Sequence, residues 1–311
     1  MEFNKSNRFN TENKKEENSN LIHYKGEIGE FDYDPNIWEI RKYIGNEYLH
    51  LKNAYVENLE LPKGLTSCFY LFVDCKLPEN FSLGNKFDTS NVTDMTGMFK
   101  YCKLPENFTL GDKFNTSNVK DMTNMFAKCK LPENFTLGDK FDTSNVTDMS
   151  NMFEECIISK NFSLGNNFNT SKVKYMSYMF QNCKLPENFT LGDKFDTSSV
   201  KYMKFMFSNC KLPENFSLGD KFITSNVTNM LYMFDGCRLP KNFTLGDNFD
   251  TLSVTDMTGM FFNCKLPENF TLGDKFDTSN VENMPSMFKD CQMPNSFKEK
   301  YKDLILKSQQ Q

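Results

Sequence analysis

Apolar residues recur in one fixed order along most of the chain, and the order repeats every 27 residues from Lys76 to Cys291. The copy at 103–129 reads KLPENFTLGDKFNTSNVKDMTNMFAKC, and the chain contains eight complete copies. A fixed period of this length is typical of a solenoid, in which each coil buries its apolar side against its neighbours. The pattern therefore predicts one elongated folding unit.

Each copy combines two periodicities. In the first half, Phe108 and Leu110 alternate with Asn107 and Thr109, which is the period of a short strand. In the second half, five apolar residues have the spacing of one α-helical stripe. They are Val119, Met122, Met125, Phe126 and Cys129.

The combination predicts an α/β fold, a curved leucine-rich-repeat-like solenoid of 27-residue strand–helix coils. Strands stack about 4.8 Å apart and helices about 8 to 10 Å apart. We therefore expect the stack to curve, with a parallel sheet on its inner face and helices on its outer face.

The ends of the chain depart from the repeat. Asp34 and Pro35 resemble a helix start and Gly45 a helix stop, which predicts a short helix in an N-terminal cap. Near the C-terminus, Phe297 and Tyr301 share one face of a predicted helix with Leu304 and Ile305. The predicted segments are a disordered tail at 1–20, the N-terminal cap at 21–48, a degenerate capping repeat at 49–75, the eight repeats at 76–291, and a capping helix with its tail at 292–311.

Charge and hydropathy narrow the functional classes. The formal net charge of -5 argues against a general nucleic-acid binder, which needs a basic face. No apolar run reaches the roughly 18 residues of a membrane span, so membrane insertion is not expected. The first 20 residues lack the apolar core of a signal peptide and a lipoprotein cysteine, which predicts a cytoplasmic location.

Nine of the ten cysteines follow the 27-residue period, from Cys75 to Cys291. Neighbouring copies of this position are expected to lie farther apart than the roughly 7 Å between Cα atoms that a disulfide tolerates. The tenth, Cys68, lies seven residues before Cys75, two helical turns away in the predicted helix. We expect free, buried thiols that behave as small apolar side chains.

The segment TSNVTDM followed by MF recurs along the array, as in Thr89 to Phe99, Thr143 to Phe153 and, with changes, Thr251 to Phe261. This pattern resembles the BspA-like leucine-rich repeat surface proteins, a type abundant among mycoplasma lipoproteins. The resemblance spans about Leu65 to Cys291. It implies a leucine-rich-repeat-like solenoid, display on a cell surface, and adhesion or protein binding without catalysis.

The chain offers little for catalysis. Its only histidines, His23 and His50, lie outside the array, and the common phosphate, zinc and redox motifs are missing. We therefore predict no enzyme activity, no cofactor and no metal. The oxygen-bearing residues Asp139, Asp142, Asn145 and Asp148 leave calcium as an alternative, although turn and helix-cap roles explain them as well.

Departures from the repeat indicate a partner surface. Three central copies place aromatic and basic residues at positions where other copies carry small polar ones, and such a cluster has the composition of a binding hot spot. The predicted partner-binding residues are Tyr175, Tyr178, Tyr202, Phe205, Tyr232, Lys172, Lys174, Lys201 and Lys204. This interpretation predicts a non-catalytic scaffold that binds a protein partner. The competing explanation for the aromatic and basic residues is random drift among the repeats.

A second candidate surface is the predicted sheet face. Its rows of Asn and Ser or Thr side chains form a regular array that could contact a repetitive surface such as a glycan. The residues representing it are Asn107, Thr109, Asn134, Thr136, Asn188 and Thr190. Such ladders also stabilise stacked coils through side-chain hydrogen bonds, which would require no ligand.

Overall fold

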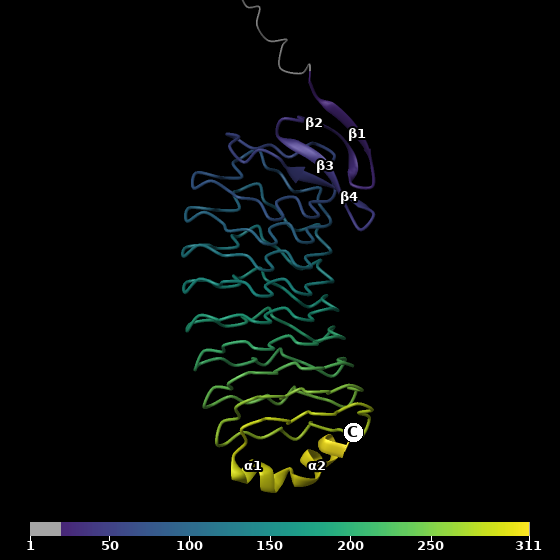
Figure 1. Cartoon of the computed structure of the whole chain (residues 1–311), viewed down its shortest axis with the longest axis vertical. Helices are drawn as coiled ribbons and strands as arrows, with labels where there is room; N and C mark the ends of the chain where they lie inside the picture. The colour runs from purple at the N-terminus through teal and green to yellow at the C-terminus, as the bar shows by residue number, and fades with distance from the viewer. Residues whose placement is uncertain (1–19, 311) are drawn as a thin grey trace, which may run out of the picture.

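The computed structural model describes residues 20–310 as an elongated stack of coils, closed by four strands at one end and two helices at the other (Figure 1). The disordered segment predicted at 1–20 lies outside the described residues, apart from Asn20. Within the described part of the chain, no helix is long and apolar enough to cross a membrane.

Two antiparallel hairpins form the N-terminal end. Strand β1 (Ile22–Gly26) pairs with β2 (Gly29–Tyr33), and β3 (Trp38–Tyr43) pairs with β4 (Asn46–Leu51). The short helix predicted after Pro35 is wrong. Ile44 and Gly45 have φ of 49° and 87°, the left-handed pair that closes a two-residue hairpin, so Gly45 belongs to a turn rather than to a helix end.

The predicted strand–helix architecture of the repeats is also wrong. Between β4 and α1 (Asn295–Lys300), the structure contains neither a helix nor a parallel sheet, only turns and isolated parallel bridges between coils, such as Asp121 with Asp148. The reason lies in the backbone. Asn124 and Lys128 have φ of 59° and 57°, and a left-handed residue every fourth position interrupts a right-handed helix.

Backbone hydrogen bonds alternate between two partners in this segment. The amides of Met125 and Cys129 donate to the carbonyls three residues earlier, which closes tight turns. The amides between them, such as those of Asn124 and Phe126, donate to carbonyls in the next coil, at Ser150 and Met152. Each coil therefore satisfies half of these donors locally and half through its neighbour.

The core contains the residues that the two periodicities assigned to it. Val119, Met122, Met125, Phe126 and Cys129 are fully buried, as are their counterparts in most copies. Phe126 stacks between Phe99 and Phe153 with ring centroids 5.6 and 5.7 Å apart. The ladder of Phe108 has similar separations of 6.2 Å on both sides, so the predicted difference in spacing between the two halves of a coil is absent.

Two short helices follow the last coil. Helix α1 and helix α2 (Lys302–Gln310) lie at the end of the stack opposite the hairpins (Figure 1). Phe297 of α1 is buried, and its ring lies 5.8 Å from that of Phe270 and 5.6 Å from that of Phe288. The aromatic stacking of the coils thus continues onto the helix that covers them.

All ten cysteines lie in the described part of the chain and are free thiols. Eight are buried, including Cys68, while Cys75 and Cys291 are half-buried, so the prediction of unpaired, largely buried thiols is confirmed. Burial raises the pKa of Cys183 and of Cys237 to about 12. These side chains are therefore protonated thiols at neutral pH and serve as core residues.

Replacing Phe126 with alanine should lower the free energy of unfolding by roughly 3 to 5 kcal/mol, the range for truncating a buried Phe. The ring is fully buried and stacks on both neighbours. Urea denaturation followed by circular dichroism measures the loss. Thr109→Ala, at an exposed position of the same coil, is the control and should change stability by less than about 0.5 kcal/mol. A loss below about 1 kcal/mol for Phe126→Ala would contradict the packing described here.

His50 is the one buried histidine of the described chain. It lies on β4 with 5% of its surface exposed, its ring 6.1 Å from that of Tyr48. Its Nε2 atom lies 4.0 Å from the Cys75 sulfur. Burial, together with the nearby Arg41 guanidinium, lowers the pKa of His50 below its ordinary value of 6.5.

Because the folded pKa of His50 is lowered, the unfolded chain binds a proton more readily than the folded one just below pH 6.5. The hairpin end should therefore lose stability as the pH falls through this window and keep its full stability above it. Unfolding followed by the fluorescence of Trp38 between pH 7.5 and 5.5 tests this expectation. His50→Phe should flatten the pH dependence, and an unchanged slope in that variant would disprove it.

Candidate functional site

Two positions of the repeat carry the aromatic residues predicted to bind a partner. Counted from the buried valine of each copy, such as Val173, they are the second and fifth residues after it, here called the plus-two and plus-five columns. The plus-two column holds Tyr175 and Tyr202, and the plus-five column holds Tyr178, Phe205 and Tyr232.

The plus-two column has a structural role in other coils. Asp121 and Asp148 each accept a hydrogen bond from the backbone amide two residues later, at 2.8 Å, and Asn229 does so at 3.0 Å. Tyr175 and Tyr202 have no short side-chain acceptor and cannot make this bond. These two adjacent coils therefore lack a turn-stabilising hydrogen bond, and a bond of this kind contributes about 1 kcal/mol to folding stability.

The plus-five column requires a left-handed backbone. Gly97, Gly259 and Asn124 suit this conformation, which carries little or no penalty for glycine and is tolerated by asparagine. Tyr178, Phe205 and Tyr232 adopt it with φ of 63°, 55° and 52°. For these bulky residues the conformation costs roughly 1 to 2 kcal/mol each.

The aromatic rings form two stacked rows. Tyr175 and Tyr202 have centroids 5.5 Å apart and planes within 4° of parallel. In the second row, the ring of Phe205 lies 4.9 Å from that of Tyr178 and 5.1 Å from that of Tyr232. Each such pair contributes about 0.5 to 1.5 kcal/mol, so stacking offsets part of the cost of strain and lost caps.

Four lysines flank these rows. Lys172, Lys174 and Lys201 are exposed, and Lys204 is half-buried. Lys172 Nζ donates to Asn145 Oδ1 at 2.7 Å, and among the described residues none of the four forms an ion pair with an acid. In these two coils tyrosine replaces the plus-two carboxylate that most other coils carry, so the lysines have fewer acidic neighbours.

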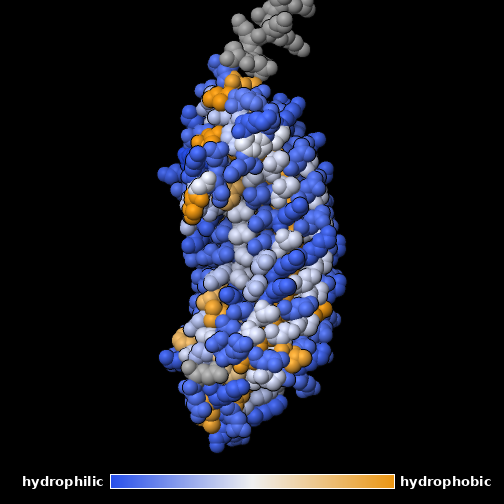
Figure 2. All heavy atoms as spheres, turned by 90° about the vertical axis from the view of Figure 1, so that its right-hand side faces the viewer, coloured by the Kyte–Doolittle hydropathy of each residue, from blue (hydrophilic) through white to orange (hydrophobic). Residues whose placement is uncertain are grey.

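The structure thus gathers all nine predicted residues on one side of three consecutive coils, and we call this set the aromatic–lysine patch. Tyr175 and Tyr202 are 41% and 36% exposed, while the three aromatic residues of the other row are half-buried. Their predicted position on an outer helix face is wrong, because these coils contain no helix. Figure 2 shows one face of the molecule, where hydrophobic residues appear as scattered spots on a largely hydrophilic surface.

Sequence reasoning missed one neighbour of the patch. The ring of Phe262 meets that of Tyr232 edge-on at 6.0 Å. Other copies place Lys100, Ala127 or Glu154 at the position of Phe262, so the departure from the repeat was visible in the sequence.

The alternative surface is exposed but does not form a hydrogen-bonded ladder. Asn107 and Thr109 are exposed, as are the other four residues of the predicted array at Asn134, Thr136, Asn188 and Thr190. Within the described chain, no hydrogen bond joins these side chains to one another. A separate buried row links the coils instead, in which the hydroxyls of Thr116 and Thr143 each donate to a carbonyl of the next coil at 2.8 Å.

Two of the residues considered for calcium cap turns and a third links neighbouring coils. Asp142 Oδ1 accepts from the Ser144 amide and Asp148 Oδ1 from the Ser150 amide, both at 2.8 Å, while Asn145 Nδ2 donates to Ser117 O. In the part of the chain that the structure covers, no group of three or more His, Cys, Asp or Glu side chains could hold a metal ion.

The architecture and the repeat define a tandem-repeat protein of stacked, hydrogen-bonded coils. Residues 66–184, 132–244 and 240–304 match a family described as "Mycoplasma protein of unknown function, DUF285", and the chain belongs to this family. No curated protein and no solved structure matches the chain. Membership in this family supports the tandem repeats and does not extend to the BspA-like leucine-rich repeat class.

Proposed function

We propose that this protein is a non-catalytic interaction scaffold whose aromatic–lysine patch binds an acidic, partly apolar segment of another protein. The observation that carries the proposal is that Tyr178, Phe205 and Tyr232 occupy left-handed positions where glycine or asparagine would be less strained. Three consecutive copies carry an aromatic residue in this column.

The arrangement of the rings supports a protein partner. Tyr175 and Tyr202 stack face to face, as do the rings of the second row, so the central faces are already in contact with one another. Nucleic-acid bases and sugar rings bind aromatic side chains mainly through those faces. The ring edges and the tyrosine hydroxyls remain available to a partner along both rows.

Ring edges carry partial positive charge, and the lysines add full charges beside them. Lys174 and Lys201 follow one another in adjacent coils without ion pairs to described residues. An acidic segment complements this potential, and apolar residues of the segment would cover the half-buried row. The resemblance of the TSNVTDM repeats to BspA-like leucine-rich repeat surface proteins fits this role, and adhesion at a cell surface is part of the proposal.

The test restores the ordinary repeat residues within the patch. A variant carrying Tyr175→Asp, Tyr202→Asp, Phe205→Asn, Lys174→Thr and Lys201→Thr regains the turn caps while losing the stacked rings. Because these effects oppose one another, its stability should lie within a few kcal/mol of the parent. Both proteins are then panned against a displayed library of random 12-residue peptides.

We expect the parent to enrich peptides that combine Asp or Glu with Leu or Phe, and the restored variant to lose them. Binding of the enriched peptides should weaken as salt increases, because salt screens exposed charges. Enrichment of neutral or basic peptides, or equal binding to both proteins, would refute the proposal. The control variant Lys211→Thr removes an exposed lysine outside the patch and should leave binding unchanged.

A second candidate function is the recognition of a repetitive glycan by the exposed Asn and Thr rows. It is favoured by two observations: these described side chains are not bonded to one another, and hollows lie between successive coils beside Thr190, Ser217 and Thr244.

Replacing Thr109, Thr136 and Thr190 together with tyrosine should abolish glycan-array binding if this second function is correct, because the larger side chains would fill the row. The same variant should bind the enriched peptides as the parent does. Glycan binding that survives the triple change, or that is absent in the parent, would eliminate this candidate.

A further inference from the structure

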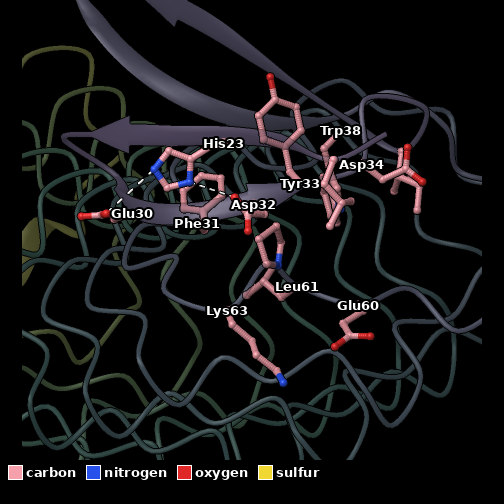
Figure 3. Close-up of a pocket in the computed structure, with 13 residues that line it drawn as sticks. His23, Glu30, Phe31, Asp32, Tyr33, Asp34, Trp38, Glu60, Leu61 and Lys63 are labelled. Carbon is pink, nitrogen blue, oxygen red and sulfur yellow. Dashed lines mark hydrogen bonds and ion pairs between the residues drawn. The ribbon is translucent and has the colours of Figure 1, made fainter. Parts of the chain in front are cut away.

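A pocket of about 610 Å³ opens at the hairpin end of the stack, distant in sequence from the aromatic–lysine patch. It lies where the β1–β2 hairpin, the start of β3 and the loop at 60–63 meet (Figure 3). Its volume falls within the usual range of ligand sites, about 300 to 1,000 Å³.

One part of the lining is apolar and fixed. Phe31 and Trp38 are buried, with Trp38 only 2% exposed, and Ile37 and Leu61 pack against the same core. The backbone amides of Ile37 and Trp38 both donate to the carbonyl of Asp34, which holds this wall in place. The pocket therefore offers a firm apolar surface to the stem of a ligand.

The charged lining divides into paired and unpaired groups. Glu30 lies 2.7 Å from the Lys25 ammonium, and Asp32 lies 2.8 Å from His23 Nδ1. Asp34 forms no ion pair with a described residue, and Glu60 has only Lys86 at the long distance of 3.8 Å. Lys63 also lines the pocket, on the same loop as Glu60, so the lining carries four carboxylates and one ammonium besides His23. Figure 3 shows Asp34 and Glu60 on the same side of the pocket, opposite His23 and Glu30.

The hollow continues past this site. A second pocket of about 330 Å³ shares Glu60, Leu61, Pro62 and Lys63 with the first and extends to Asp88 of the next coil. Two adjoining hollows across one loop suit an extended chain better than a compact small molecule.

We propose that this pocket binds a basic side chain of an extended polypeptide segment. The ammonium of lysine or the guanidinium of arginine lies on the side of the pocket that carries Asp34 and Glu60, its methylene stem lies against Trp38 and Leu61, and the peptide backbone crosses the loop at 60–63 into the second hollow. This site is independent of the proposed function, because it differs from the aromatic–lysine patch in position and in sign of charge.

Trp38 is the only tryptophan of the chain, so the tryptophan fluorescence comes from a single residue in the wall of this pocket. The probes are N-acetyl-Ala-Arg-Ala-Ala-amide, the same peptide with norleucine in place of arginine, and cadaverine as a free amine. Amide shifts of Tyr33 and Leu61 in NMR spectra give a second readout that does not depend on the indole.

We expect saturable changes with the arginine peptide at an affinity at least tenfold higher than with the norleucine peptide or with cadaverine. Asp34→Asn and Glu60→Gln should each weaken binding of the arginine peptide by tenfold or more. Asparagine at position 34 retains the side-chain oxygen that accepts from the Asn36 amide, so this variant keeps the local turn. Glu27→Gln, an exposed acid outside the pocket lining, is the control with the same change in charge.

Three results would overturn the proposal. Equal binding of the arginine and norleucine peptides would show that charge has no role. Cadaverine binding as tightly as the peptide would assign the pocket to a free amine. An arginine peptide that produces no shift in either readout at millimolar concentration, in a parent protein with an intact melting transition, would show that the pocket does not bind this class of ligand.

Discussion

Hydrogen bonding between the backbones of successive coils is the constraint on which this structure depends. In each repeat that another coil follows, every second amide of the segment equivalent to that around Asn124 and Phe126 donates to the next coil, and the amides between them close local turns. This alternation fixes the register of the stack. It also requires left-handed residues at set positions, so one backbone pattern determines which side chains fit each column.

The core follows from that register. Because equivalent residues lie in line, Phe126 meets Phe99 and Phe153 with nearly parallel rings, and the buried hydroxyl of Thr116 reaches a carbonyl of the following coil. The first and last coils each lack one neighbouring coil, so other elements cover them. Two hairpins cover the first coil, and Phe297 of α1 extends the aromatic stacking beyond the last one.

The sequence allowed the buried residues to be predicted, but not the backbone that buries them. The spacing of Val119, Met122 and Met125 fits a helix as well as a chain of tight turns, and burial alone cannot distinguish the two. The distinguishing signal was present in the column that contains Gly97, Asn124 and Gly259, since glycine and asparagine at one position indicate a left-handed residue. The hairpin turn at Ile44 and Gly45 was not predicted, because a β-branched residue such as isoleucine rarely adopts positive φ.

The grouping of the candidate site was predictable for the same reason as the core, because residues 27 positions apart lie side by side. The column of Gly97, Asn124 and Gly259 also pointed to strain at Tyr178 and Phe205, which share that position, and the structure shows it in their φ of 63° and 55°. The pocket beside Trp38 was not predictable, because it joins the hairpins to the loop at 60–63, and no repeat relates these segments.

The row of rings in the plus-five column, formed by Tyr178, Phe205 and Tyr232, also has a direction. A side-chain carbon placed on Gly259 would lie 2.1 Å from the ring of Tyr232, and one on Gly97 would lie equally close to the ring of Tyr70. Each ring therefore leans over the coil that follows it. The row begins beside Asn151 and ends over a bare glycine, so its two ends are chemically different. A segment lying along it would distinguish head from tail and bind in a single polarity.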